Sequence, residues 1–234
     1  MDKEIFEREI LKLGIDLDEN KLNKLDKFYK FLIEKNKVMN LTAITDEKEV
    51  YLKHFYDSLT ICRVIDLREY DSLCDVGSGA GFPGIVLKIF FPHLKITLID
   101  SLNKRVNYLN ELISVLSLKD IKAKHIRMED FSKDNEEKFD LITARAVAST
   151  SVLSEISVKA LKIKGKLLLY KGIFNEEEEI SQNLLQELSL KIELIEKFNL
   201  ILENSQRSLV ILSKEKKTKA KYPRMMSKIK KELL

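Results

Sequence analysis

The sequence predicts an α/β fold: a mostly parallel β-sheet covered by helices, with a C-terminal antiparallel strand and a small N-terminal helical region. Before residue 67, the apolar residues recur only at helical spacing. From Ser72 to Leu188, short β-rich runs alternate with helical ones, and such alternation is typical of a parallel sheet. Two more β-rich runs near the end, Ile192–Phe198 and Ser208–Leu212, can pair antiparallel.

The N-terminal region, residues 1–66, is predicted to be helical. Asp46 and Glu49 stand three residues apart, as a helix cap and its partner do. The segment Asn40–Ile44 is predicted to interrupt the helices. Two sets of apolar residues have the spacing of one helix face, namely Leu22, Leu25, Phe28, Tyr29 and Leu32, then Leu52, Phe55, Leu59 and Cys62.

Residues 67–213 are predicted to form the α/β domain. Its predicted alternating strands are Ser72–Val76, Lys95–Ile99, Ile121–Ile126, Phe139–Thr143 and Lys166–Tyr170. Its predicted helices are Ile85–Phe91, Lys104–Leu116, Val152–Leu161 and Glu176–Leu188. Ligands of such sheets bind at the carboxyl ends of the strands, so the residues that follow each strand are candidates for a site.

Residues 214–234 form a predicted basic tail. It holds nine Lys or Arg and two Glu, a net charge of +7, which leaves −3 for the rest of a chain whose total is +4. A basic tail on a slightly acidic body suggests a phosphate-rich partner. A solvated extension without a partner is the alternative.

The composition argues against membrane and metal-cluster proteins. No apolar run approaches the roughly 20 residues of a membrane-spanning helix, and the charged N-terminus has no signal-peptide core. Cys62 and Cys74 are too few for a metal cluster, and their apolar contexts predict buried, inert thiols. We therefore expect a cytoplasmic monomer without a bound metal or a membrane partner.

A glycine-rich turn follows the first predicted strand. Gly77, Gly79, Gly81 and Gly84 fall within eight residues, just before the first helix of the α/β domain. Glycine permits positive φ and lets the backbone approach a ligand without a Cβ in the way. A strand, a glycine-rich turn and a helix N-terminus together predict a site for an adenosine-containing cofactor.

Two cofactors fit this turn. Gly79-x-Gly81-x-x-Gly84 matches the dinucleotide fingerprint, which indicates NAD(P). Asp75 and Gly77 extend the pattern to Asp75-x-Gly77-x-Gly79-x-Gly81, the first signature of Rossmann-like methyltransferases. The helical region in front of the turn is also common in that class. We therefore predict a Rossmann-like class I S-adenosylmethionine-dependent methyltransferase, with S-adenosyl-L-methionine as the cofactor.

Two further segments follow predicted strands. Asp100 ends an apolar strand, where one carboxylate can accept both hydroxyl protons of a ribose. It could instead cap the next helix. The segment Arg127–Asp130 follows the third strand and is predicted to be a loop, in which a backbone N–H and an apolar side chain could hold an adenine.

Together these segments resemble the bacterial 16S ribosomal RNA guanine-N7 methyltransferases, also called glucose-inhibited division protein B, over residues 40–214. The motifs that carry the resemblance are Asn40-Leu41-Thr42, His54-Phe55-x-Asp57-Ser58-Leu59, Asp75 to Gly84, Asp100-Ser101-Leu102-x-Lys104-Arg105, Thr143-Ala144-Arg145-Ala146-Val147-Ala148 and Tyr170-Lys171-Gly172. The chain departs from the family pattern at Met128-Glu129, where relatives usually have Ala-Glu. It also lacks the Gly-Thr-Pro turn that usually follows Tyr222-Pro223-Arg224 closely.

The resemblance implies transfer of a methyl group to N7 of a specific guanine in 16S rRNA, at the guanine-527 class of site. The implied partner is 16S rRNA or the small ribosomal subunit. The implied cofactor-site residues are Gly77, Phe82, Met128, Glu129 and Arg145, to which the patterns above add Gly79 and Asp100.

Guanine N7 carries a lone pair and no proton, so direct in-line transfer needs no general base. Orientation alone can supply about 7–11 kcal/mol of the barrier at best. The sequence shows no loop cysteine for pyrimidine C5 methylation and no Asn/Asp-Pro-Pro-aromatic segment for an exocyclic amine. Arg145 follows the fourth strand, and we expect it to be catalytic by binding the cofactor carboxylate, a phosphate or guanine O6. A structural ion pair is the alternative.

Four cations are candidates for RNA binding. Lys104 and Arg105 begin a predicted helix, where cations are disfavoured unless they serve a ligand. Arg207 precedes the last strand and Arg224 lies in the tail. Solvated side chains are the alternative. His54, one helical turn from Asp57, is predicted to serve packing or interdomain bonding, because the reaction needs no base.

Two other functions remain open from the sequence. An NAD(P)-dependent oxidoreductase could use the same glycine fingerprint. A non-catalytic RNA-binding relic of the methyltransferase fold could also keep it, although the glycine turn and Asp100 are both intact.

Overall fold

The structure is a computed structural model that describes residues 1–176 and 180–231. The chain forms two compact units. The first comprises Met1–Asp71 and Ser78–His125, and the second comprises Ser72–Gly77 and Ile126–Leu234. The backbone passes from the second unit to the first within the glycine-rich turn.

The first unit begins with the helical region. Its elements are α1 (Lys3–Lys12), α2 (Glu19–Met39), α3 (Glu47–Val50), the π-helix η1 (Tyr51–Tyr56), α4 (Asp57–Leu59) and the 3₁₀ turns η2 (Thr60–Arg63) and η3 (Leu67–Glu69). Asp46 accepts a hydrogen bond from the N–H of Glu49 at 3.1 Å, which confirms the predicted cap. Asn40 ends α2 in the left-handed conformation, with φ 50°, which confirms the predicted break.

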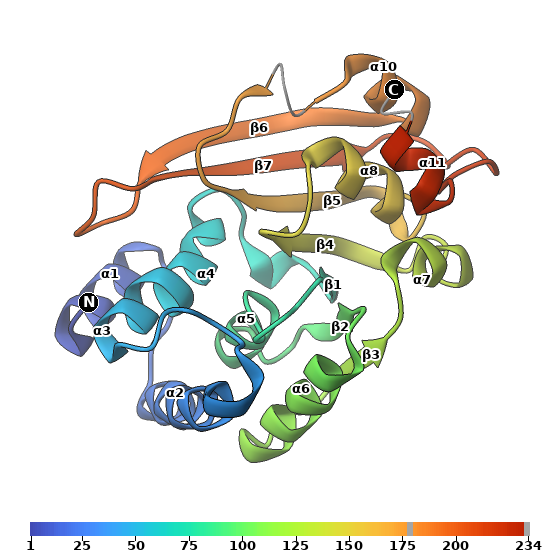
Figure 1. Ribbon diagram of the computed structural model, residues 1–234. Coiled ribbons are helices and arrows are strands. Elements are labelled where there is room, and N and C mark those ends of the chain that lie inside the picture. Colours follow the sequence, from blue (N-terminus) through green and yellow to red (C-terminus); the bar gives the residue numbers. More distant parts are fainter. Residues whose placement is uncertain (177–179, 232–234) are drawn as a thin grey trace. The chain divides into compact units, whose positions relative to one another are not determined.

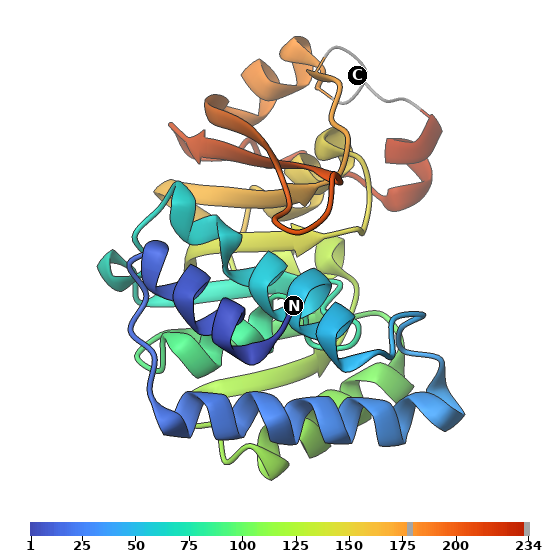
Figure 2. The same cartoon turned by 90° about the vertical axis from the view of Figure 1, so that its left-hand side faces the viewer.

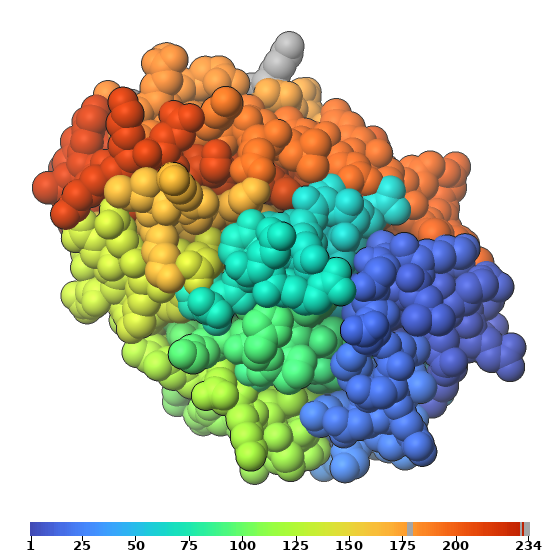
Figure 3. Space-filling model, turned by 180° about the vertical axis from the view of Figure 1, so that it is seen from behind, coloured from blue at the N-terminus to red at the C-terminus, as the bar shows by residue number. Residues whose placement is uncertain are grey.

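The rest of the first unit consists of a pair of parallel strands and the two helices that pack on them. Its elements are α5 (Gly84–Phe90), β2 (Lys95–Asp100), α6 (Asn103–Val115) and β3 (Ile121–His125), with Ile96 of β2 opposite Ile121 of β3. The long helix α2, conspicuous in Figure 2, packs on α5 and α6. In the space-filling view its blue surface adjoins the green surface of the residues that follow the turn (Figure 3).

The second unit holds five strands in the order β1-β4-β5-β7-β6. β1, β4 and β5 are parallel, and β7 pairs antiparallel with both β5 and β6 (Figure 1). The elements are β1 (Ser72–Val76), α7 (Met128–Asp134), β4 (Phe139–Arg145), α8 (Thr150–Ser157), β5 (Leu161–Lys171), α10 (Gln182–Leu188), β6 (Leu190–Asn199), β7 (Gln206–Lys214) and α11 (Met226–Lys231).

The predicted α/β class is confirmed, with its parallel strands, its C-terminal antiparallel strand and its N-terminal helices. The predicted loop Arg127–Asp130 is wrong, because α7 begins at Met128 with two acidic residues in its first turn, where the helix dipole favours them. The predicted helix Val152–Leu161 is too long: α8 ends at Ser157, and Leu161 instead pairs with Phe139 of β4.

Part of the predicted helix Glu176–Leu188 lies outside the described residues, at positions 177–179, and α10 begins only at Gln182. The proposed division of the chain into residues 1–66, 67–213 and 214–234 stays a prediction. Within the described residues, no helix combines the length and apolar character needed to cross a membrane.

Candidate cofactor and RNA site

Three glycines of the turn have conformations that side chains rarely adopt. Gly77, Gly79 and Gly81 have φ values of 68°, 55° and 99°. In the second unit, a Cβ at Gly77 would lie 2.6 Å from Cγ2 of Val147. In the first unit, a Cβ at Gly81 would lie 2.9 Å from Cγ1 of Ile85 and 3.2 Å from Cζ of Phe28. The backbone conformation therefore favours glycine at all three positions, and the close packing adds to this requirement at Gly77 and Gly81.

Asp100 ties the glycine turn to the end of β2. Its side chain is buried, and its Oδ2 accepts a hydrogen bond from the N–H of Gly79 at 3.0 Å. Its Oδ1 accepts from the N–H of Leu102 at 2.9 Å. Leu102 is itself the residue before the first turn of α6, so Asp100 does not act as the cap of that helix. A carboxylate can accept about four hydrogen bonds, so these two backbone bonds leave acceptor capacity for the hydroxyls of a ligand.

Phe82, the largest side chain of the turn, is buried in the first unit. Its ring stacks on Phe28 of α2, with centroids 5.1 Å apart and an interplanar angle of 16°. It also stacks on His54 of η1, at 4.5 Å and 19°. The helical region therefore contacts the predicted cofactor turn directly.

In the second unit, the ends of β1 and β4 bring two predicted residues close together. Val76, the last residue of β1, is opposite Ala144 of β4. Gly77 directly follows Val76 and Arg145 directly follows Ala144, so the two residues lie at the same edge of these strands. Arg145 is half-buried. The side chain of Lys171, at the end of β5, donates to the carbonyl of Ala148 at 2.9 Å, which ties the segment after β4 to β5.

Met128 and Glu129 form the first turn of α7, and both are buried. The guanidinium of Arg127 lies 3.8 Å from Oε1 of Glu129. The predicted cofactor residues thus divide between the units: Gly79, Phe82 and Asp100 belong to the first, and Gly77, Met128, Glu129 and Arg145 to the second.

The candidate RNA-binding cations also divide between the two units. Lys104 is exposed at the start of α6, and Arg105 places Nη1 3.7 Å from Oδ2 of Asp100. In the second unit, Arg207 lies within β7 and not before it as predicted, and it donates from Nη1 to the carbonyl of Gln206 at 3.1 Å. Their roles in RNA binding stay predictions.

Arg224 is held by a carboxylate of its own unit. Its Nε and Nη2 donate to the two oxygens of Glu155 at 2.8 and 2.7 Å, and its backbone N–H donates to Oε1 at 3.0 Å. The Glu155 side chain is 0% exposed and the Arg224 side chain 14%. This pairing indicates a structural role for Arg224. If its guanidinium bound an RNA phosphate instead, the carboxylate of Glu155 would remain buried without a counter-charge, which is costly.

The basic tail begins inside the fold of the second unit. Lys214 is the last residue of β7, and its buried ammonium donates to the carbonyls of Val158 and Leu161 at 3.0 and 2.7 Å. Desolvation by this burial lowers the pKa of Lys214. Tyr222 is also buried, and its hydroxyl donates to Glu187 of α10 at 3.4 Å. The part of the tail that the structure describes is therefore anchored at several buried residues, although most of its residues are exposed.

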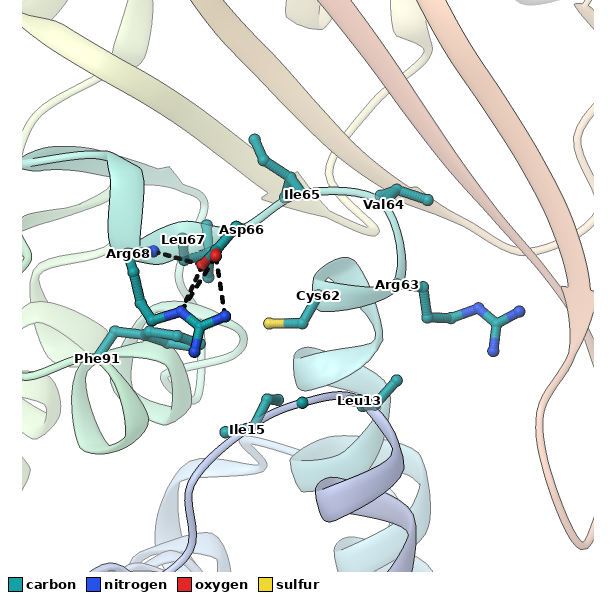
Figure 4. Close-up of a pocket in the computed structure, with 11 residues that line it drawn as sticks. Leu13, Ile15, Cys62, Arg63, Val64, Ile65, Asp66, Leu67, Arg68 and Phe91 are labelled. Carbon is teal, nitrogen blue, oxygen red and sulfur yellow. Dashed lines mark hydrogen bonds and ion pairs between the residues drawn. The ribbon is translucent and has the colours of Figure 1, made fainter.

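A cavity of about 260 Å³ in the first unit includes none of the predicted site residues. Figure 4 shows Cys62 pointing toward it, near an ion pair between Asp66 and Arg68 with an N–O distance of 2.8 Å. Burial raises the pKa of Cys62 to about 12, which agrees with an inert thiol.

The family model of rRNA small subunit methyltransferase G, GidB, matches residues 21–210. The chain belongs to this family. Among its relatives, the ribosomal RNA small subunit methyltransferase G of Bacillus licheniformis is 43% identical over 227 residues, covering 96% of this chain and 95% of the relative. The protein of the same name from Bacillus cytotoxicus is 44% identical, with the same coverage.

Solved structures share the fold at low sequence identity. The YcgJ protein of Bacillus subtilis has a TM-score of 0.57 at 13% identity and covers 70% of this chain and 100% of its own. A SAM dependent methyltransferase from Aquifex aeolicus has a TM-score of 0.51 at 17% identity and covers 72% of this chain and 94% of its own. These likenesses support the Rossmann-like methyltransferase fold.

Membership of the methyltransferase G family bears out the resemblance seen in the motifs. The stacking of His54 on Phe82 confirms the predicted packing role of His54, although its partner was not predicted, and the role of Glu155, which holds the tail, was not predicted at all. Glu155 could have been suspected, since it is the one charged residue in the otherwise apolar or hydroxylated helix Thr150–Ser157. The sequence offers no signal for the partner of His54, because stacking on Phe82 depends on contacts distant in sequence.

Proposed function

We propose that this member of the methyltransferase G family transfers a methyl group from S-adenosyl-L-methionine to N7 of a guanine in 16S rRNA, at the guanine-527 class of site. Family membership supports rRNA methylation and the cofactor. The naked rRNA or the small subunit is the proposed partner, and the cytoplasm the proposed place of action. The observation that carries the proposal is the glycine turn whose Gly79 N–H is fixed by buried Asp100.

The residues present fit S-adenosyl-L-methionine. The cofactor supplies a methyl group on a positively charged sulfur, which the guanine N7 lone pair can attack directly. Asp100 is proposed to accept the ribose hydroxyls, and the positive φ values of Gly77 and Gly79 are proposed to give the backbone turn that approaches the cofactor. Phe82, Met128 and Glu129 are proposed to bind the remainder of the cofactor.

Arg145 is proposed to be the catalytic residue. It stands at the carboxyl end of β4, the edge at which ligands of such sheets bind. A guanidinium there can bind the cofactor carboxylate, a phosphate or guanine O6, and so orient the methyl donor and acceptor. No group of the protein has to remove a proton, because N7 carries none.

Arg145→Ala tests the proposal. We expect methyl transfer from labelled cofactor to 16S rRNA to fall at least about a hundredfold, because a charge-assisted anchor in the site is lost. Arg8→Ala is the matched control, since Arg8 is an exposed arginine of α1 that pairs with Glu9 at 3.2 Å. Unchanged transfer by the folded Arg145→Ala variant would remove the assigned role.

The methylated position and the cofactor need separate measurements. N7-methylguanine mapped in rRNA from cells with and without the protein should differ at one guanine, and methylation of a different atom would contradict the proposed acceptor. Calorimetry should show saturable binding of S-adenosyl-L-methionine. Binding of NAD(P)H instead would favour the oxidoreductase, and cofactor binding without methyl transfer to naked rRNA or to the subunit would favour the relic.

A further inference from the structure

The glycine turn has few side chains by which the rest of the protein can hold it. Between Gly77 and Gly84, Phe82 is the one side chain larger than proline. Its ring stacks on both Phe28 and His54, with centroid distances of 5.1 and 4.5 Å and interplanar angles of 16° and 19°. The Phe82 ring is therefore the one large side chain by which the turn itself is anchored, beside the hydrogen bonds that Gly79 makes to Asp100 and that Ala80 accepts from Tyr108.

The imidazole of His54 is itself oriented by two hydrogen bonds. Its Nδ1 lies 3.1 Å from the carbonyl oxygen of Lys53, which can only accept, so Nδ1 carries the proton. Its Nε2 lies 2.9 Å from Oγ1 of Thr42 and accepts from that hydroxyl in the neutral ring. These two bonds fix both the tautomer and the plane of the ring that faces Phe82.

Thr42 is in turn fixed by the end of α2. The side chain of Asn36 accepts from the N–H groups of Leu41 and Thr42 at 2.6 and 3.0 Å and donates to the carbonyl of Thr42 at 2.9 Å. The Thr42 hydroxyl also accepts from the N–H of Ile44 at 3.1 Å. A continuous set of contacts thus runs from the break after α2, through Thr42 and His54, to the glycine turn.

We propose that His54 is a positioning residue for S-adenosyl-L-methionine, acting through the ring of Phe82; this rests on the proposed function of the turn. The oriented imidazole holds Phe82, and with it the turn from Gly79 to Gly81, in the conformation that binds the cofactor. This assigns a role to two motifs that the chemistry leaves unused, Asn40-Leu41-Thr42 and the segment that begins at His54. His54 is not a base, since its Nε2 faces a hydroxyl of the helical region.

The test compares His54→Ala, His54→Leu and His54→Phe. Loss of the ring should raise the Kd of S-adenosyl-L-methionine and its KM about tenfold, or about 1.4 kcal/mol, with kcat and the KM for rRNA within about twofold. His54→Leu should behave like His54→Ala, because a leucine fills space but cannot stack. His54→Phe should restore most of the affinity. Equal rescue by leucine and phenylalanine would reduce His54 to a packing residue and overturn the proposal.

Two further measurements establish whether His54 acts through Phe82. In a Phe82→Leu background, His54→Ala should cause little additional loss of cofactor affinity, because coupled residues are not additive. A full tenfold additional loss would mean an independent role and would overturn the route through Phe82. Thr42→Val, which keeps the shape and removes the hydroxyl, should raise the Kd in the same direction by a smaller factor.

His93→Ala is the matched control. His93 also faces an aromatic ring, that of Phe91 at 6.4 Å, and a carbonyl, that of Leu67 at 3.3 Å. Neither of these two partners belongs to the glycine turn, whereas the partner of His54 does. The His93→Ala variant should bind S-adenosyl-L-methionine with the affinity of the unmodified protein. If the unmodified protein does not bind S-adenosyl-L-methionine, the proposed function fails; if it binds and His54→Ala binds equally well, only the positioning role fails.

Discussion

The N-terminal region contacts the glycine turn through stacked rings, whereas the C-terminal tail is fastened within its own unit by ion pairs and hydrogen bonds. Phe28 and His54 stack on the ring of Phe82, and salt has little effect on such contacts. Arg224 and Glu155 form a buried ion pair, and Glu187 accepts bonds from exposed lysines. The contacts of the N-terminal region are therefore proposed to shape the glycine turn, whereas those of the tail stabilise the fold of the second unit.

The largest expected effect belongs to the buried ion pair of the tail. Arg224→Ala leaves the carboxylate of Glu155 buried without its guanidinium, which costs about 3–5 kcal/mol of unfolding free energy. Chemical denaturation measures this loss. The double variant Arg224→Met with Glu155→Leu should recover much of the stability, because no buried charge then remains. A stable Arg224→Ala protein that has lost only RNA affinity would instead make Arg224 an RNA ligand.

Substitution in the glycine turn is expected to have the next largest effect. Gly77→Ala combines a φ of 68° with a Cβ placed 2.6 Å from Val147, so we expect a loss of about 1–3 kcal/mol of stability and weaker cofactor binding. Gly14→Ala is a control for backbone strain alone, since Gly14 has φ 70° and nothing within 4 Å of its would-be Cβ. Equal losses at the two positions would show that contact with Val147 contributes nothing.

Gly172→Ala completes this series. A Cβ at Gly172 would also meet nothing within 4 Å, and its φ is not positive, so both stability and cofactor affinity should stay within about 0.5 kcal/mol of the unmodified protein. Thermal unfolding of the three alanine variants side by side therefore separates steric contact, backbone strain and the general effect of replacing a glycine.

The sequence predicted local features well and distant contacts poorly. The cap at Asp46, the break at Asn40 and the positions of the strands follow from short-range patterns, and the structure confirms them, except that β5 begins at Leu161 and not at Lys166. The start of α7 was missed, because a seven-residue helix has too few turns to show a periodicity.

The anchoring of the site is the part that the sequence could not reveal. The stacking of His54 on Phe82 joins residues 28 positions apart, and Arg224 meets Glu155 across 69 positions. Charge counting treated residues 214–234 as one basic tail, although burial removes Lys214 from solvent and pairing occupies Arg224. The net charge of a segment does not tell which of its charged side chains are desolvated.

A truncation placed after the anchored residues should affect RNA binding alone. Removing residues 230–234 deletes two lysines and one glutamate but keeps Lys214, Tyr222, Arg224 and the buried Ile229. We expect a modest loss of rRNA affinity and a shallower dependence of log K on log salt, by about one or two counterions. The unfolding free energy serves as the control and should change little. An unchanged salt slope would mean that the end of the tail does not contact phosphates.

The smallest expected effect is the acid weakening of the exposed bonds at Glu187. Hydrogen bonds from Lys221 and Lys219 lower the pKa of Glu187 from 4.5 to about 2. A lowered carboxyl pKa means that these contacts stabilise the tail above about pH 4.5, and that their contribution is lost as the pH falls from there toward 2. NMR titration of the Glu187 carboxyl should therefore give a midpoint well below 4.5. Lys219→Met with Lys221→Met should return that midpoint toward the ordinary value, and a midpoint that is already ordinary in the unmodified protein would show that the exposed lysines do not hold the tail.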